Sequence, residues 1–588
     1  MAVSSNWFNT GTTAADAFYQ ADDVRFNDTA GVMTIIDILD AVAPATVTID
    51  ATNNAYTFNG PGRISGGANL LKKGDSTLVV NSTNDFTGTV TLERGILQLG
   101  NNSSLGSTAG GTVISDGATL DIGITDYAAN TVNIGVEPLT VSGAGYAGQG
   151  AIVNNSANAQ QNAVRMVTLA GNASFGGNGR WDIRGTGATL STGGNPYKMT
   201  KVGANQLSIV GANVDPTLGD IEIQAGTLSF ETGTTSAGDP TKLLTVQPGG
   251  TLQVYQLLVA LDKRIILNGD GASFYNNNGV NTVAGPITLN GNCVFNVGGT
   301  SLTLLNTLSG AGGLTKIGNN VLSLSAVSTY SGDTVVNAGT LALTGTGSIS
   351  GSSNITLAAA TTLLDVSART DGKLTLPGGR TLTGNGTIRG SLQVNAGGTL
   401  SPGNPSLGAA VDALTVTDVV TLGGTNIMEI DKSNLTNDVI RGAAAIQYGG
   451  TLNVTEISSI PFVDGDSFKL FDATSYSGAF TSITPATPAA GLFWDTSELT
   501  SSGTLKVVAT APPPSITSVV KSGNNIVFSG SGGIPSDPYY VLVSTDIALP
   551  VSNWTPIVTN SFGAGGEFSF TEAVNPDVPR RFYLLQVP

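Results

Sequence analysis

The chain has 588 residues, of which 78 are glycine, and only 11% carry a charged side chain. Globular domains usually have about 25% charged residues, whereas a content of 40% hydrophobic residues is too high for a disordered chain. The net charge of −16 repels phosphate backbones and argues against nucleic acid as a partner. The lack of any histidine excludes a Ser/His/Asp triad, a Cys/His pair and histidine-bound zinc.

The first 60 residues are predicted to form a cap and the first β-strands. Trp7, Phe18, Tyr19 and Phe26 supply apolar surface for this cap. The start of the sequence shows no basic region followed by an apolar core, so no signal peptide is visible, and the sequence leaves open whether the initial Met is native. No run of 18 apolar residues occurs, which excludes a membrane-spanning helix.

One pattern recurs within residues 61–400, with copies at 70–99, 199–230 and 312–343. Each copy opens with a lysine that a glycine follows two residues later, and three apolar pairs then alternate mostly with Thr, Ser, Gln, Glu or Asn. This alternation indicates three short strands, each with one buried face. Repeats of this length are typical of stacked arrays, in which each unit buries its apolar face against the next.

The predicted fold is all-β, with residues 61–400 forming a right-handed parallel β-helix of three strands per turn. Gly95, Gly226 and Gly339 precede the third apolar pair of the three copies, at a bend where a positive φ costs glycine little. A string of β-sandwiches is the alternative, but β-sandwiches do not usually repeat one three-strand sequence motif with a glycine at the same corner. Residues 401–510 are predicted to add further turns and a second cap.

A candidate catalytic pair lies in the stretch RWDIRGTG. Asp182 and Arg184 project from one face of a predicted strand, while Trp181 and Ile183 project from the other. Carboxylates and arginine can act on a polysaccharide without histidine, so the pair is a candidate for lyase or hydrolase chemistry. A surface ion pair is the favoured interpretation, because no second carboxylate lies close in sequence, although a neighbouring turn could supply one.

Calcium is the only metal for which candidate ligands are found. Asp464 and Asp466 in FVDGDSF, and Asp22 and Asp23 in QADDVRF, are acidic pairs in irregular stretches that could offer the oxygen ligands calcium prefers. Capping of turns by the Asp side chains is the favoured interpretation. No cofactor and no catalytic residue is predicted.

The only cysteine, Cys293, alternates in step with Phe295 and Val297 and is predicted to be a buried core thiol. After residue 510 the composition changes. Residues 511–515 form a proline-rich linker, and residues 516–588 contain several short strand-like runs. This pattern predicts a small immunoglobulin-like or fibronectin-like β-sandwich.

The stretch GGLTKIGNNVLSLSAVSTYSGDTVVNAGTLAL resembles the autotransporter-associated β-strand repeat, also called the passenger-associated transport repeat, of secreted passenger domains in Gram-negative bacteria. The resemblance covers roughly residues 55–510 and implies an extracellular or cell-surface β-helix without implying a particular activity. The chain departs from the classical pattern because too few residues follow position 510 for a membrane β-barrel. Release, or attachment by another route, is therefore expected.

Two classes of function follow from these observations. The first is a non-enzymatic structural or adhesive protein that recognises a glycan or a surface receptor. It could also form homo-oligomers or filaments, head to tail, through the ends of the β-helix and the C-terminal domain. The alternative is a polysaccharide-degrading or glycan-binding β-helix. The repeats explain how the chain folds but not which surface it recognises.

Overall fold

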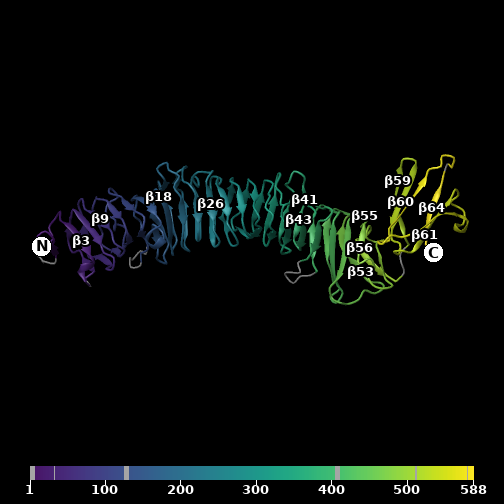
Figure 1. The fold of residues 1–588 in the computed structure, drawn as a ribbon, viewed down its shortest axis with the longest axis horizontal. Helices are drawn as coiled ribbons and strands as arrows, with labels where there is room; N and C mark the ends of the chain where they lie inside the picture. The colour runs from purple at the N-terminus through teal and green to yellow at the C-terminus, as the bar shows by residue number, and fades with distance from the viewer. Residues whose placement is uncertain are drawn as a thin grey trace. The chain divides into compact units, whose positions relative to one another are not determined.

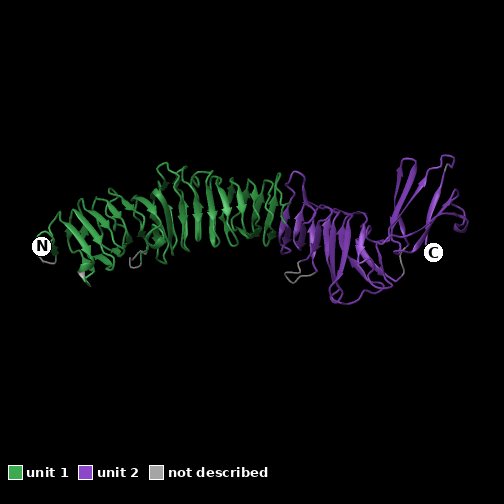
Figure 2. Ribbon diagram, in the orientation of Figure 1, with its two compact units in different colours: residues 1–352 green, residues 353–588 purple. Residues whose placement is uncertain are grey.

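The computed structural model describes residues 7–31, 33–124, 131–403, 411–509, 513–578 and 580–587, so Met1 and part of the predicted linker at 511–515 lie outside the described residues. Two compact units, residues 1–352 and 353–588, are distinguished in Figure 2. Helical residues within the described ranges are confined to the short 3-10 turns η1 (Asp28–Ala30), η2 (Tyr146–Gly148) and η4 (Val551–Asn553). Across these same ranges, no helix has the length and apolarity needed to span a bilayer.

Unit 1 is a parallel β-solenoid, because strands of successive turns pair in parallel (Figure 1). Its first turns build two columns of strands that meet on the long strand β18 (Met166–Gly177). The first column contains β3 (Asp23–Asn27), β6 (Thr46–Asp50), β9 (Asn69–Lys72), β11 (Val90–Leu92), β13 (Thr112–Ile114) and β15 (Pro138–Gly143). The second contains β4 (Ile35–Asp37), β7 (Tyr56–Asn59), β10 (Thr77–Val80), β12 (Gly95–Leu99), β14 (Ala118–Asp121) and β16 (Ile152–Asn154).

Further parallel columns follow in unit 1, one of which begins just before β18 in the sequence. One contains β21 (Met199–Lys201), β24 (Ile221–Ile223), β26 (Leu243–Val246), β28 (Arg264–Leu267), β31 (Ile287–Leu289) and β34 (Leu308–Ser309). A second contains β17 (Gln160–Val164), β19 (Trp181–Arg184), β22 (Gln206–Val210), β25 (Gly226–Glu231), β27 (Gly250–Tyr255), β29 (Ser273–Asn278), β32 (Cys293–Val297), β35 (Leu314–Ile317) and β37 (Thr334–Val336). A third contains β30 (Val280–Val283), β33 (Ser301–Leu304), β36 (Val321–Leu324) and β38 (Thr340–Leu343). The predicted parallel solenoid is thus confirmed.

The repeat spans parts of two stacked turns. In the first copy, β9 and β10 form one turn, and β11 and β12 lie directly on them in the next, with Leu70 opposite Val90 and Leu78 opposite Leu97. The other two copies pair in the same way. The three apolar pairs of each copy do lie on three strands, as predicted, but these strands belong to two stacked turns, because periodicity shows where strands lie but not which strands stack.

The lysine that opens each copy is a core residue. Lys72, Lys201 and Lys316 are fully buried, and each Nζ donates to three backbone carbonyls at a corner. For Lys201 the acceptors are Val202, Gly203 and Ala225, at 2.7, 2.8 and 3.3 Å. A protonated amine has three hydrogens to donate, so this geometry uses all of them. Burial lowers the pKa of Lys201 to about 7.

The corner glycines behave as predicted. Gly95, Gly226 and Gly339 have φ values of 77°, 66° and 66°, in the left-handed region that favours glycine. Neighbouring turns also come close to these positions, since a Cβ built on Gly226 would lie 2.4 Å from the carbonyl oxygen of Asn205. Both backbone conformation and space therefore require glycine at this corner.

Aromatic side chains gather at the N-terminal end of the solenoid. Trp7, on the antiparallel pair β1 (Trp7–Asn9) and β2 (Ala14–Asp16), packs against Phe18 and Phe26 with ring centroids 6.4 and 5.6 Å apart. Tyr19, predicted to join this cap, is instead 59% exposed. Its hydroxyl-bearing ring tolerates water better than the Phe rings do.

In unit 2 the solenoid has three parallel sheets, to which each turn contributes one strand. The first contains β39 (Asn354–Leu357), β42 (Thr381–Gly384), β45 (Thr399–Pro402), β48 (Thr425–Asp431), β52 (Thr451–Glu456) and β56 (Ser482–Thr484). The second contains β40 (Leu363–Asp365), β43 (Thr387–Arg389), β46 (Ala413–Val416), β50 (Val439–Ala443) and β54 (Phe471–Ala473). The third contains β41 (Lys373–Leu376), β44 (Ser391–Val394), β47 (Val419–Leu422), β51 (Ala445–Tyr448) and β55 (Tyr476–Gly478).

A short antiparallel sheet combines a strand from the last of these turns with two strands that follow them. Strands β53 (Ser467–Lys469), β58 (Thr504–Val508) and β57 (Phe493–Asp495) form one sheet, where Phe462 packs against Phe468 and Trp494 with centroids 5.7 and 5.2 Å apart. Trp494 is buried, and its Nε1 donates to the carbonyl of Pro485 at 2.8 Å. This apolar cluster lies within the segment predicted to cap the solenoid.

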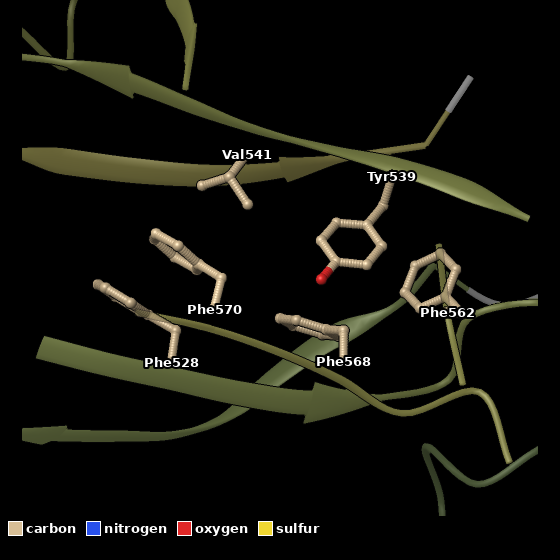
Figure 3. Close-up of a cluster of buried hydrophobic side chains, with 6 residues drawn as sticks. All are labelled: Phe528, Tyr539, Val541, Phe562, Phe568 and Phe570. Carbon is tan, nitrogen blue, oxygen red and sulfur yellow. The ribbon is translucent and has the colours of Figure 1, made fainter. Parts of the chain in front are cut away.

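The last strands form two antiparallel sheets, β59 (Ser515–Ser522), β60 (Asn525–Ser531) and β63 (Phe568–Ala573), and β61 (Pro538–Ser544), β62 (Thr555–Ser561) and β64 (Phe582–Gln586). Buried side chains from both sheets share one core (Figure 3): Phe528, Tyr539, Val541, Phe562, Phe568 and Phe570. The predicted two-sheet packing is present, and the immunoglobulin-like or fibronectin-like topology stays a prediction.

Candidate functional site, an arginine cleft

Parallel pairing aligns polar side chains from successive turns on one face of the sheet that contains β19, β22, β25 and β27. Asp182 is opposite Ser208, which is opposite Ser229. Two residues further along the same strands, Arg184 is opposite Val210, and Val210 is opposite Glu231. Glu231 is therefore two strands away from Arg184 in the stack. Because stacked strands lie about 4.8 Å apart, the long Arg184 side chain can reach it.

Two arginines and two carboxylates form one network at this place. Arg180 donates to both oxygens of Asp182, with Nε 2.9 Å from Oδ1 and Nη2 3.2 Å from Oδ2, and its Nη2 also reaches Oε1 of Glu231 at 3.3 Å. The Nη2 of Arg184 lies 2.8 Å from Oδ2 of Asp182 and 3.7 Å from Oε2 of Glu231. Glu231 is thus the second carboxylate that the sequence could not locate.

The network is only partly accessible to solvent. The Asp182 side chain is fully buried and that of Glu231 is 7% exposed, whereas those of Arg180 and Arg184 are 29% and 30% exposed. Burial raises the pKa of Asp182 above its usual range, against the influence of both arginines. Burial works to lower the pKa of Arg180, but hydrogen bonding and charge from Asp182 and Glu231 outweigh it and raise that pKa.

This geometry corrects the interpretation of Asp182 and Arg184 as a surface ion pair. The two residues do share a face, as predicted, but Asp182 is inaccessible and belongs to a four-residue network. A buried carboxylate that two guanidinium groups already neutralise is poorly placed to act as a catalytic base on a polymer. Asp182 is therefore a positioning residue that holds the two guanidinium groups.

A hollow of about 320 Å³ adjoins the network, within the size range of small-molecule sites. Its lining combines hydrogen-bond donors, acceptors and one aromatic ring: Gln161, Arg180, Arg184, Val210, Glu231, Thr232, Tyr255 and Asn277. Gln161 also lines a second hollow of about 360 Å³, together with Thr131, Val132, Asn133, Ala159 and Asn162. We call the first hollow the arginine cleft.

The four aspartates considered as candidate calcium ligands have other partners. Asp464 accepts a hydrogen bond from the backbone N–H of Ala509 at 2.8 Å, and Asp466 accepts one from Val463 and pairs with Lys432. Asp22 accepts from the Tyr19 N–H and Asp23 from the Thr46 hydroxyl. Nowhere in the described ranges do three metal-ligating groups converge.

Cys293 is buried, as predicted, and lies on the inward face of β32 with Phe295 and Val297. Burial raises the pKa of its thiol above the usual value. A buried, protonated thiol is a weak nucleophile, so Cys293 is a core residue.

Comparison with known proteins identifies the repeat. The model of the passenger-associated-transport-repeat family matches residues 70–99 and 314–343. Residues 199–230 share with these two stretches the buried lysine, the corner glycine and the strand pairing, although the family model does not mark them.

Two adhesins resemble the chain. The adhesin BmaC autotransporter of Brucella suis biovar 1 (strain 1330) is 28% identical over 288 residues, which are 47% of this chain and 8% of that protein. The crystal structure of the Haemophilus influenzae Hap adhesin matches with a TM-score of 0.31 and 12% identity, over 83% of this chain and 64% of that one. The chain thus spans less than a tenth of the length of its curated relative. The chain carries passenger-associated transport repeats and is related in sequence, over about half its length, to an autotransporter adhesin.

Proposed function

We propose that this chain is a non-enzymatic, secreted or cell-surface adhesive protein whose solenoid serves as a scaffold for surface contacts. The observation that carries the proposal is the pair of matched passenger repeats, together with the relation over 288 residues to a protein named as an autotransporter adhesin. The side chains support a binding role over a catalytic one, because the carboxylates of the arginine cleft are already paired with arginine.

Adhesion can be measured with beads that carry the purified chain. We expect retention several times above that of beads with an equal amount of an unrelated protein on at least one of four surfaces: bacterial cells, a polysaccharide coat, a matrix glycoprotein coat and bare polystyrene. Equal retention on all four would contradict the proposal. Release of sugar fragments from the polysaccharide coat would instead favour the alternative, a polysaccharide-degrading enzyme.

We further propose that copies associate through the solenoid ends and the C-terminal domain. In the described residues β3, β4 and β5 (Ala41–Val42) pair on one side only, which leaves their other edges free to accept a strand. Met33, Ile35 and Leu39, in and beside β4, are 75%, 65% and 71% exposed, and such apolar exposure at an open edge is typical of a contact surface. In the C-terminal domain, β59 is an edge strand that pairs with β60 on one side, and its Val519 and Val520, on opposite faces, are 60% and 55% exposed.

Light scattering and electron microscopy across a range of concentrations test this association. We expect filaments or higher oligomers that disappear in the Ile35→Lys variant, because a charge on the apolar edge opposes pairing. Val419→Lys, at an outward position of β47 that is 38% exposed, is the matched control and should leave assembly unchanged. Monomers at every concentration would overturn the proposal.

A further inference from the structure

The arginine cleft contains binding groups that its own network does not use. Arg184 approaches Asp182 and Glu231 through Nη2, at 2.8 and 3.7 Å. Its Nε is buried without a partner. A buried donor without a partner is costly, and because the Arg184 side chain is 30% exposed, its other guanidinium N–H groups can donate to a ligand in the cleft.

The groups around Arg184 suit a polyhydroxylated ligand. Gln161 and Asn277 offer amide donors and acceptors, and the half-buried Tyr255 offers both a ring face and a hydroxyl. The Glu231 carboxylate already accepts from Arg180 and keeps lone-pair capacity for one further donor. Adjacent sugar hydroxyls each donate and accept, so they can pair with a guanidinium and a carboxylate side by side. An aromatic ring beside such groups packs against the apolar face of a sugar ring.

Charge favours an uncharged sugar. Two arginines and two carboxylates make the cleft neutral as a whole, and the chain carries a net charge of −16. An anionic polymer would be repelled by the net charge of the chain, and the two arginines that could attract it are already neutralised by Asp182 and Glu231. A neutral ligand meets neither penalty.

The surroundings favour an oligomer over a single sugar. Gln161 lines both the cleft and the second hollow, whose other lining residues include Asn133 and Asn162. Polar side chains thus continue from one hollow to the next on the same unit. A chain of several sugars could use both hollows.

We propose that the arginine cleft is a binding site for a neutral oligosaccharide, held by Arg184, Glu231 and Tyr255, with Asp182 positioning the guanidinium groups. This inference rests on the proposed adhesive function, for which it names the ligand class and the place. The proposed site binds the oligosaccharide non-covalently, and the sugar is released chemically unchanged.

Calorimetry with the full chain tests the site, using gluco-, manno- and galacto-configured neutral hexasaccharides and an oligogalacturonate as the anionic comparator. We expect at least one neutral probe to bind and the anionic probe to bind more weakly. Arg184→Gln and Tyr255→Ala should each raise Kd by about tenfold or more. Arg264→Gln, at an exposed arginine on β28 outside the cleft, is the matched control and should leave Kd unchanged.

Circular dichroism of each variant shows whether it keeps the fold, and Tyr255→Phe provides a milder change that retains the ring. Failure of every neutral probe to bind, an unchanged Kd in both cleft variants, or tighter binding of the oligogalacturonate would each overturn the inference. If the beads still adhere when Arg184→Gln is introduced, adhesion stands and the cleft is not its site. If the unmodified chain does not adhere, the proposed function itself fails.

Discussion

Gly226→Ala is expected to destabilise the solenoid by about 3 to 5 kcal/mol around the second repeat. Two penalties add at this corner: a left-handed φ of 66° and a Cβ only 2.4 Å from the Asn205 carbonyl oxygen. Turns of a solenoid open locally. Hydrogen exchange measured by mass spectrometry on peptides covering residues 199–231 therefore reports the change directly.

Gly249→Ala separates the two penalties. Gly249 also has a positive φ, of 83°, but a Cβ there meets no atom within 4 Å. This control should cost only about 1 to 2 kcal/mol. An equal loss of protection in both variants would show that the close approach of the Asn205 carbonyl contributes nothing.

Lys201→Met is expected to destabilise the same region by roughly 3 kcal/mol near neutral pH. The methionine fills similar space but leaves the buried carbonyls of Val202, Gly203 and Ala225 without their donor. Guanidinium unfolding followed by circular dichroism measures the loss. Lys198→Met, at a lysine that is 40% exposed and pairs with Glu222, is the control and should change stability by less than about 1 kcal/mol.

The same lysine predicts a dependence on pH. The pKa of Lys201 is about 7 in the folded chain and near its ordinary value of 10.5 when unfolded, so between these values the unfolded state binds more protons. Stability should therefore rise with pH across this window. The Lys201→Met variant should lack the part of this rise that Lys201 contributes between about pH 7 and about pH 10.5. An unaltered pH profile would mean that the amine keeps its proton in the fold, held by the three carbonyls.

Much of the solenoid could be predicted because its determinants are local. The alternation of apolar residues gives strands, the glycines at positions 95, 226 and 339 give corners, and repetition of both gives parallel stacking. Cys293 could be placed in the core because it keeps step with Phe295 and Val297. In each case, neighbours in the sequence carry the information.

Only part of the arginine cleft could be predicted from the sequence. Asp182 and Arg184 are two residues apart on one strand, so their shared face follows from strand geometry. Glu231 comes from another turn, and its contact with both arginines depends on the pairing register of β19, β22 and β25.

The sequence by itself determined the strands, the corner glycines, the repeats and the all-β character of this protein, because periodicity and turn chemistry act between close neighbours. Only the tertiary structure decided which strands stack, that Lys72, Lys201 and Lys316 lie in the core, and that Glu231 completes the network around Arg184. These features depend on contacts between turns, and such contacts exist only once parallel pairing has set the register.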